Sequence, residues 1–111
     1  MYEKNLNIGY LLDFYGDVLP ERKRNVLDMY YNEDFSLAEI SEEIGISRQG
    51  VRDIIKKAEE ELCFFESKLG LSKKMTDLAQ KTDSLLAVAI ETQASAVVCE
   101  GIAELKKRIE Q

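Results

Sequence analysis

The chain has 111 residues, 45% of them hydrophobic, and carries 15 Lys and Arg residues against 21 Asp and Glu residues. One Pro, six Gly and few alternating runs of β-branched residues favour an all-α chain with one modest core. The sequence has no His, the commonest general base and metal ligand, and shows no nucleophile–base pair or phosphate loop, so we expect no enzyme, metal site or cofactor.

Two helices are predicted in the first third of the chain. The first runs from about Glu3 to Tyr15 and is ended by Gly16. Its expected core face consists of Leu6, Tyr10, Leu11 and Phe14. The second opens at Pro20, a residue that suits the first turn of a helix, and runs to about Asn32. Its expected core residues are Val26, Leu27, Tyr30 and Tyr31.

A helix-turn-helix is predicted in the middle of the chain. Ser36 and Glu39 have the spacing of a capping box at the start of its first helix. Gly45 can supply the positive φ that a tight turn between helices needs, and Ile46 follows as an apolar plug under the turn. Ser47 is then placed to cap the second helix.

The second helix of this unit is expected to continue to about Lys68 and to carry two separate faces. At 100° per residue, its apolar residues gather on one side: Val51, Ile54, Ala58, Leu62, Phe65 and Leu69. Arg48, Arg52 and Lys56 recur at every fourth position and form a basic stripe away from that side. Such a stripe either solvates a helix face or contacts nucleic acid, and its place on the second helix favours nucleic acid.

The candidate nucleic-acid-binding residues lie in the first three turns of this helix. In DNA-binding units of this kind that part of the helix enters the major groove, where Arg reads guanine and Gln reads adenine, while Lys holds phosphates. The predicted site consists of Ser47, Arg48, Gln49, Arg52, Asp53, Lys56 and Lys57.

The overall charge opposes this interpretation. Nine of the 15 basic and fifteen of the 21 acidic residues precede Leu71, so all the excess acid lies beside the predicted reader helix. Glu59, Glu60 and Glu61 follow the basic stripe and would repel phosphate, which confines any contact to the first three turns. The acidity favours an alternative hypothesis, a module that binds a protein or ribonucleoprotein without reading a DNA sequence.

Residues 71–111 are predicted to form a helical dimerisation region beyond a helix-turn-helix domain of residues 1–70. Apolar residues recur there at helical spacing in two phases: Leu71, Met75, Leu78, Thr82, Leu85 and Ala89, then Val98, Ile102, Leu105 and Ile109. The pattern allows one long helix, or a hairpin broken near residues 82–84 or 92–95. Either form leaves more apolar surface than one small core covers, so we expect a homodimer through these C-terminal helices.

The sequence also predicts a cytoplasmic protein without membrane insertion. Glu3 and Asp13 lie where a signal peptide would need an apolar stretch. The longest uncharged apolar run, residues 85–90, is too short to span a membrane. Cys63 and Cys99 are expected to be buried, unpaired thiols in a reducing compartment.

Several short motifs carry a resemblance to known proteins: Leu19-Pro20-Glu21-Arg22, Tyr30-Tyr31, Phe35-Ser36-Leu37 and Ser47-Arg48-Gln49. Together they resemble region four of bacterial sigma factors, and more closely the YlxM family of small bacterial helix-turn-helix proteins. The similarity is good from about Asn5 to Leu71 and holds for the C-terminal helices only in kind. It implies a sigma-region-four-like fold and a cytoplasmic, regulatory protein with components of the signal recognition particle pathway as partners.

Two residues depart from the usual pattern of such units. Gly50 stands where Ala is more usual, which costs on the order of 1 kcal/mol inside a helix. It either allows a ligand to approach the backbone closely or is a tolerated substitution. Ser41 stands where Ala often lies at the contact between the two helices, and it is small enough to fit there.

Overall fold

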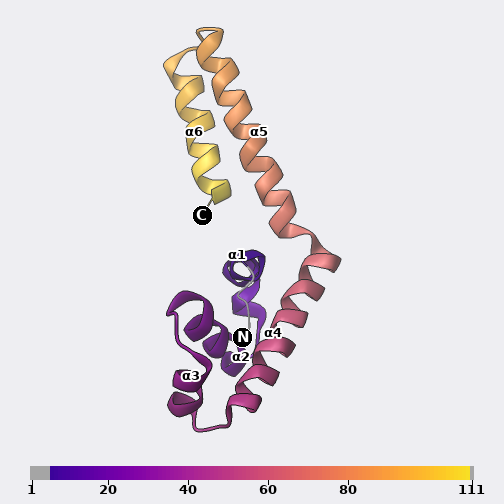
Figure 1. The fold of residues 1–111 in the computed structure, drawn as a ribbon. Coiled ribbons are helices and arrows are strands. Elements are labelled where there is room, and N and C mark those ends of the chain that lie inside the picture. The colour runs from indigo at the N-terminus through magenta and orange to yellow at the C-terminus, as the bar shows by residue number, and fades with distance from the viewer. Residues whose placement is uncertain (1–5, 111) are drawn as a thin grey trace. The chain divides into compact units, whose positions relative to one another are not determined.

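The computed structural model describes residues 6–110, and side-chain burial is described for residues 7–110. Within this range the chain is almost entirely helical and contains no strand, which confirms the predicted all-α fold class (Figure 1). The chain divides into two compact units, Met1–Gly70 and Leu71–Gln111. None of the helices within residues 6–110 is long and apolar enough to cross a membrane.

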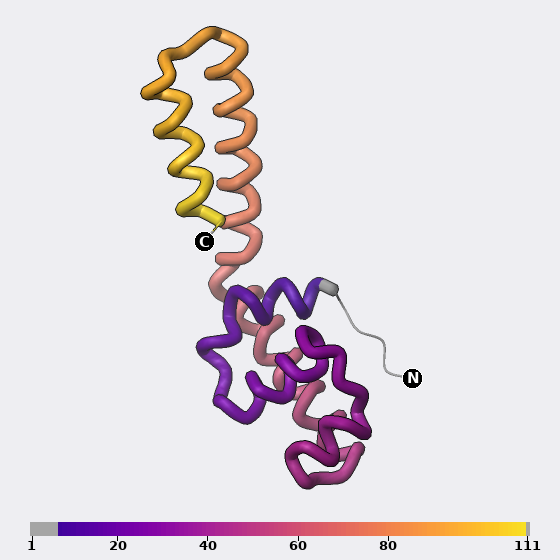
Figure 2. Tube along the Cα trace, turned by 90° about the vertical axis from the view of Figure 1, so that its left-hand side faces the viewer, coloured from indigo at the N-terminus to yellow at the C-terminus, as the bar shows by residue number. Residues whose placement is uncertain are grey.

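The first unit is built around one long helix, α4, against which three shorter helices pack (Figures 1 and 2). Its elements are α1 (Leu6–Tyr15), the 3-10 turn η1 (Gly16–Val18), α2 (Glu21–Leu27), the π turn η2 (Asp28–Asn32), α3 (Leu37–Ile44) and α4 (Arg48–Leu69). The largest fully buried side chains come from α2, α3 and α4: Val26, Leu27, Ile40, Val51, Ile55 and Leu62. Burying such aliphatic side chains is the main driving force for folding a unit of this size.

The helix α3 begins with a complete capping box, as its sequence predicts. The Ser36 hydroxyl accepts a hydrogen bond from the Glu39 backbone N–H at 3.0 Å, and the Glu39 carboxylate accepts one from the Ser36 N–H at 3.0 Å. The two bonds satisfy backbone donors that a helix start otherwise leaves to water. The donated backbone bond lowers the pKa of Glu39 below its usual value, because it stabilises the charged carboxylate.

The predicted core face of α1 is correct for Leu11 and wrong for Tyr10 and Phe14. Tyr10 and Phe14 are 43% and 37% exposed, and the buried residues are Ile8, Leu11, Leu12 and Tyr15. Both sets fit helical periodicity, because α1 is apolar on more than one side, and the packing against α4 selects the second set. The predicted start at Glu3 and the burial of Leu6 lie outside the described residues.

The second predicted helix is correct in extent, but its last turn is wider than an α-helix. The backbone N–H of Glu33 donates to the Asp28 carbonyl at 3.0 Å, which closes the π turn η2. This turn buries Tyr30 in the core. The next side chain, Tyr31, lies edge-on to the Tyr30 ring, with ring centroids 5.2 Å apart.

Two burial predictions for α4 are wrong, those for Leu69 and Cys63, and Ile54 packs against the core less deeply than its neighbour. Ile55 is fully buried, whereas its neighbour Ile54 is only partly buried, and Leu69 is 58% exposed near the end of the helix. Cys63 is exposed, because it follows the buried Leu62 by one residue and its side chain is therefore turned about 100° away from the core. The helix ends where predicted, at Gly70, which adopts a positive φ of 62°.

The second unit is a hairpin of two antiparallel helices, α5 (Leu71–Glu91) and α6 (Ala96–Glu110), packed side by side (Figures 1 and 2). Of the two forms that the sequence allows, the structure shows the hairpin, broken at residues 92–95. Gln93 takes a positive φ of 58° in the turn, and the Ala94 N–H donates to the Ala89 carbonyl at 2.8 Å.

Small side chains form the buried seam of α5. Thr82 and Ala89 are buried in it, whereas Ser72, which is also buried, lies beyond the level at which α6 ends. The Thr82 hydroxyl donates to the Leu78 carbonyl at 2.7 Å, so its burial leaves no unpaired donor. Across the seam, the Lys106 ammonium contacts the Asp83 carboxylate at 2.5 Å, which raises the pKa of Lys106 above its usual value.

Several of the larger apolar residues in the helical pattern of this region are accessible in the hairpin, as the prediction of surplus apolar surface implies. Leu71, Leu78 and Leu85 of α5 are 41–49% exposed. Val98 and Leu105 of α6 are about half exposed, and α6 has no buried residue. Close approach of the helices at the small seam residues leaves the leucines beside the seam rather than in it.

Candidate nucleic-acid interface

The turn between α3 and α4 fixes the direction in which α4 begins. Gly45 takes a positive φ of 72°, and its N–H donates to the Ser41 carbonyl at 2.9 Å. The Ser41 hydroxyl in turn donates to the Ile46 carbonyl. Ile46 is partly buried and packs against the core, and the Ser47 hydroxyl accepts the Gly50 N–H at 3.0 Å, so the predicted plug and cap are both confirmed.

The hydroxyl of Ser41 does more than its size suggests. From the sequence, the only property expected of Ser41 at the inter-helix contact is its small size. Its bond to the Ile46 carbonyl satisfies a backbone acceptor in the turn, which an Ala at this position leaves unpaired. The only signal in the sequence is a serine where alanine is usual, five residues before the acceptor.

Four cations project from the first three turns of α4. Arg48, Arg52, Lys56 and Lys57 are all exposed, and none of them forms an ion pair or a side-chain hydrogen bond with any residue in the range 6–110. The buried side of α4 begins at Val51 in these turns and continues along the helix. The basic stripe is therefore displayed to solvent, with its charges available to an external anion.

The other predicted site residues surround this stripe. Gln49 and Asp53 are exposed one turn apart, and the Gln49 amide donates to the Asp53 carboxylate at 3.1 Å. Ser47 is exposed at the helix start, where its oxygen already accepts the Gly50 N–H. All seven predicted residues are therefore exposed in the structure. Within this set, Gln49 and Asp53 are hydrogen-bonded to each other.

The acidic residues further along α4 hold the first unit together. The Tyr31 hydroxyl of η2 donates to Glu59, and the Lys23 ammonium of α2 pairs with Glu61. One turn beyond, the Tyr15 hydroxyl donates to Glu66 at 2.6 Å. A charged acceptor makes such bonds stronger than neutral ones.

These bonds change the interpretation of the acidic run. Its sequence suggests charges that only repel phosphate, but Glu59 and Glu61 attach the preceding helices to α4. Glu60 remains exposed, with no side-chain bond in the described part of the chain. The partners lie 28 and 38 residues away in sequence, so no local pattern reveals them.

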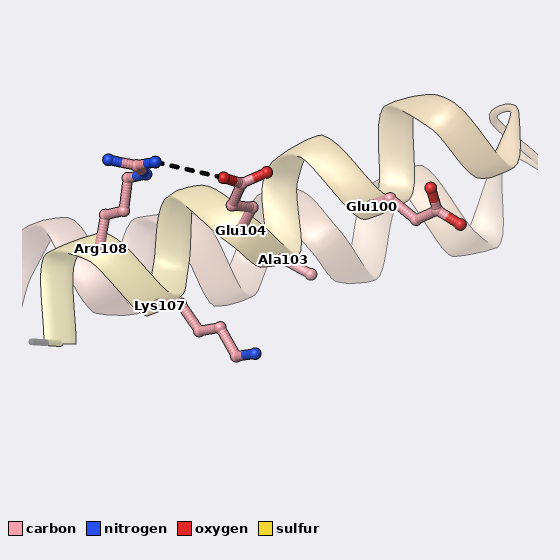
Figure 3. A pocket seen from close by; sticks show the side chains of 5 residues that line it. All are labelled: Glu100, Ala103, Glu104, Lys107 and Arg108. Atoms are coloured by element: carbon pink, nitrogen blue, oxygen red, sulfur yellow. Dashed lines mark hydrogen bonds and ion pairs between the residues drawn. The ribbon is translucent and has the colours of Figure 1, made fainter.

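A second surface feature lies on the C-terminal hairpin (Figure 3). A depression of about 580 Å³ is lined by Glu100, Ala103, Glu104, Lys107 and Arg108, and the Arg108 guanidinium contacts Glu104 at 3.4 Å. All five lining residues belong to α6. Within residues 6–110 there is also no cluster of His, Cys, Asp and Glu placed to hold a metal ion.

The capped turn, the plug beneath it and the exposed second helix define a helix-turn-helix protein. The chain belongs to the UPF0122 family, described as "Putative helix-turn-helix protein, YlxM / p13 like", whose pattern matches residues 2–100. The match includes α5 and the first residues of α6, so it extends beyond the first unit.

Relatives from several bacteria match most of the chain. A UPF0122 protein of Thermoanaerobacter sp. (strain X514) is 41% identical over 104 residues, covering 91% of this chain and 89% of the relative. One of Caldanaerobacter subterraneus subsp. tengcongensis is 46% identical over 85 residues, covering 77% and 73%. A UPF0122 protein of Clostridium kluyveri is 43% identical over 84 residues, or 76% of each chain.

Proposed function

We propose that this protein is a regulator that binds duplex DNA through the first three turns of α4. The observation that carries the proposal is the set of four exposed, unpaired cations, Arg48, Arg52, Lys56 and Lys57, on the second helix of a helix-turn-helix. An unpaired cation can bind a phosphate or a base without first breaking an ion pair within the protein.

Each side chain suits a distinct contact in this proposal. Arg48 and Arg52 can donate two hydrogen bonds to one guanine in the major groove. Lys56 and Lys57, further along the helix, bind phosphates, and Ser47 offers its hydroxyl proton to a phosphate at the helix start. Gln49 can read adenine, and its bond to Asp53 uses one of the two amide protons and leaves the other proton and the amide oxygen available.

Such a regulator needs a second copy of the chain, and the hairpin offers a face through which two copies can pack. Leu71, Leu78 and Leu85 recur at seven-residue spacing on one flank of the seam, and Val98 and Leu105 take the same flank on α6. Equivalent flanks of two antiparallel helices lie on one face of a hairpin. We infer that two copies pack by this face into a four-helix bundle, which doubles the number of reader helices.

A salt titration of DNA binding tests the proposal. Two copies that each place Lys56 and Lys57 on phosphates neutralise four charges, so the logarithm of the binding constant should fall with log salt at a slope of roughly −3.6. Purified full-length chain and a labelled random-sequence duplex suffice, with binding followed by fluorescence anisotropy. Absence of binding at about 50 mM salt, or a slope near zero, rejects DNA as the ligand.

A cytoplasmic module of the signal recognition particle pathway is the second candidate. It rests on the resemblance to the YlxM family and on the excess of acidic over basic residues before Leu71. Signal recognition particle RNA in place of the duplex separates the two candidates. Retention of this RNA at physiological salt, together with release of duplex DNA, favours the second.

A further inference from the structure

Two neighbouring depressions on the first unit form one groove along α2, η2 and the adjoining end of α3. The first, of about 520 Å³, is lined by Glu21, Arg22, Asn25, Val26, Met29 and Ile44. The second, of about 410 Å³, is lined by Asn25, Asp28, Met29, Glu33, Phe35 and Glu43. Asn25 and Met29 belong to both and join them, and no residue of α4 takes part.

The floor of this groove is apolar. Met29, Phe35 and Ile44 pack against the core but remain partly exposed, so each still presents apolar surface to the groove. Met29 lies at the centre, and its unbranched side chain can adapt to differently shaped ligands. Such a floor favours leucine-like or phenylalanine-like side chains of a partner.

The rim of the groove is acidic. Glu21, Glu33 and Glu43 are exposed, and within residues 6–110 none of their carboxylates has an ion pair or hydrogen bond. Asp28 lies on the same rim, where it accepts a hydrogen bond from the Asn32 amide at 2.9 Å and pairs with the Arg24 guanidinium at 3.9 Å. Arg22 is the one cation among the lining residues. The charge of this rim excludes nucleic acid and attracts lysine and arginine.

The backbone at the centre of the groove is shaped by the π turn. Asp28 and Met29 belong to η2, and the Met29 carbonyl accepts the Phe35 N–H at 2.9 Å, which holds two floor residues together. A π turn is a costly departure from the α-helix and occurs frequently at functional sites.

We propose that this groove binds a basic, amphipathic helical segment of another protein. Apolar side chains of the segment cover Met29, Phe35 and Ile44, and its lysines or arginines pair with Glu21, Glu33 and Glu43. The groove shares no residue with the basic stripe of α4, so this site does not depend on DNA binding. A protein of this design joins a nucleic acid to a second protein, each on its own surface.

The test uses the full chain and a labelled synthetic amphipathic peptide made only of leucine and lysine. Asn25→Trp fills the groove at the residue that both depressions share, and Glu43→Lys reverses one rim charge. Each should weaken peptide binding at least about tenfold in fluorescence anisotropy at about 0.15 M salt. Glu60→Lys makes the same charge change on α4, outside the groove, and should leave the affinity within about twofold.

Two results would overturn the proposal. If Glu60→Lys weakens binding as much as Glu43→Lys, the peptide responds to net charge and has no defined site. If Asn25→Trp binds with wild-type affinity, the groove is not where the peptide lies. A leucine and glutamate peptide of the same length serves as the negative control and should not bind.

Discussion

Gly50 and Ile46 are in close contact across the start of α4. A Cβ atom added at Gly50 would lie 3.2 Å from Cδ1 of Ile46 and 3.3 Å from the hydroxyl oxygen of Ser47. Both neighbours belong to the turn that orients the reader helix. The plug and the cap of the turn therefore account for a small residue at position 50 without any ligand.

This contact predicts a non-additive effect of two substitutions. Gly50→Ala should gain clearly less than the roughly 1 kcal/mol that helix propensity offers, because the new methyl group crowds Ile46. Ile46→Val removes Cδ1 and should by itself lower the free energy of unfolding by about 0.5–1.5 kcal/mol. In the Ile46→Val background, Gly50→Ala should gain more of the stability that helix propensity offers. Urea unfolding of all four proteins gives the coupling energy. Additive free energies would show that the contact does not strain the turn.

Ile46→Asp should destabilise the first unit by about 3 kcal/mol or more, because it places a carboxylate under the turn, against the core. Thermal unfolding followed by circular dichroism measures the loss. Asn25→Asp adds the same group at an exposed position and should change stability by less than about 0.5 kcal/mol. A wild-type midpoint for Ile46→Asp would mean that the turn does not need its plug.

Arg52→Ala and Lys57→Ala should affect DNA binding differently. Arg52→Ala should cost about 1–3 kcal/mol and relax the sequence preference, whereas Lys57→Ala should weaken all sequences alike and reduce the salt slope by roughly 1.8, because both copies lose a phosphate contact. Binding to a pool of randomised duplexes, sequenced before and after selection, measures both effects. Lys107→Ala, on the exposed surface of α6, is the matched control and should bind as the wild type does.

The hairpin face should make the protein a dimer in solution. Replacing Leu78 and Leu85 together by Lys should give a monomer, because it places charges where two apolar faces meet. A chain ending at Gly70 should remain helical and also be monomeric. Light scattering reports the mass of each protein, and a monomeric wild type contradicts the dimer.

The charge of Glu39 in the capping box should contribute to stability only above acidic pH. Because the folded state lowers the pKa of Glu39 below its ordinary value of 4.5, the stabilisation is fully present above that value and is lost as the pH falls through the folded-state pKa. Glu39→Gln keeps the geometry and removes the charge. Its urea midpoint should fall below that of the wild type at neutral pH and equal it at the lowest pH, whereas a constant difference would exclude the charge as the cause.

Local features of the fold could be predicted from the sequence, because their causes lie within a few residues. Ser36 and Glu39, or Gly45 and Ser47, determine a cap or a turn by direct contact with their neighbours. The same holds for Gly70 at the end of α4, where a residue without a side chain permits a positive φ.

Choices between equivalent helix faces could not be predicted, because distant helices make them. Tyr10 fits the periodicity of α1 as well as Ile8 does, and only the position of α4 shows which is buried. The adjacent Ile54 and Ile55 pose the same problem on α4. In the hairpin, helical spacing does not show that the leucines lie beside the seam, since Thr82 and Ala89 allow a closer approach than leucines do.

The candidate site also has one part that could be predicted from the sequence and one part that could not. The basic stripe follows from helical spacing alone, and the structure places its cations on the exposed surface where that spacing puts them. The bond from Lys23 to Glu61 joins residues far apart in the chain, so the structural role of the acidic run could not be read from its composition. The role of the stripe in binding stays a prediction.

The bonds made by Glu59, Glu61 and Glu66 separate the acidic residues of α4 that bond to the rest of the first unit from the cations of the first three turns, which do not. The acidic residues beyond the third turn bond to the preceding helices. Substitutions there should therefore lower the melting temperature before they alter which ligand is bound. Substitutions among the unpaired cations of the first three turns remove no internal bond and can alter what is bound at constant stability. Relatives could therefore acquire new recognition sequences in these turns without any compensating change in the rest of the fold.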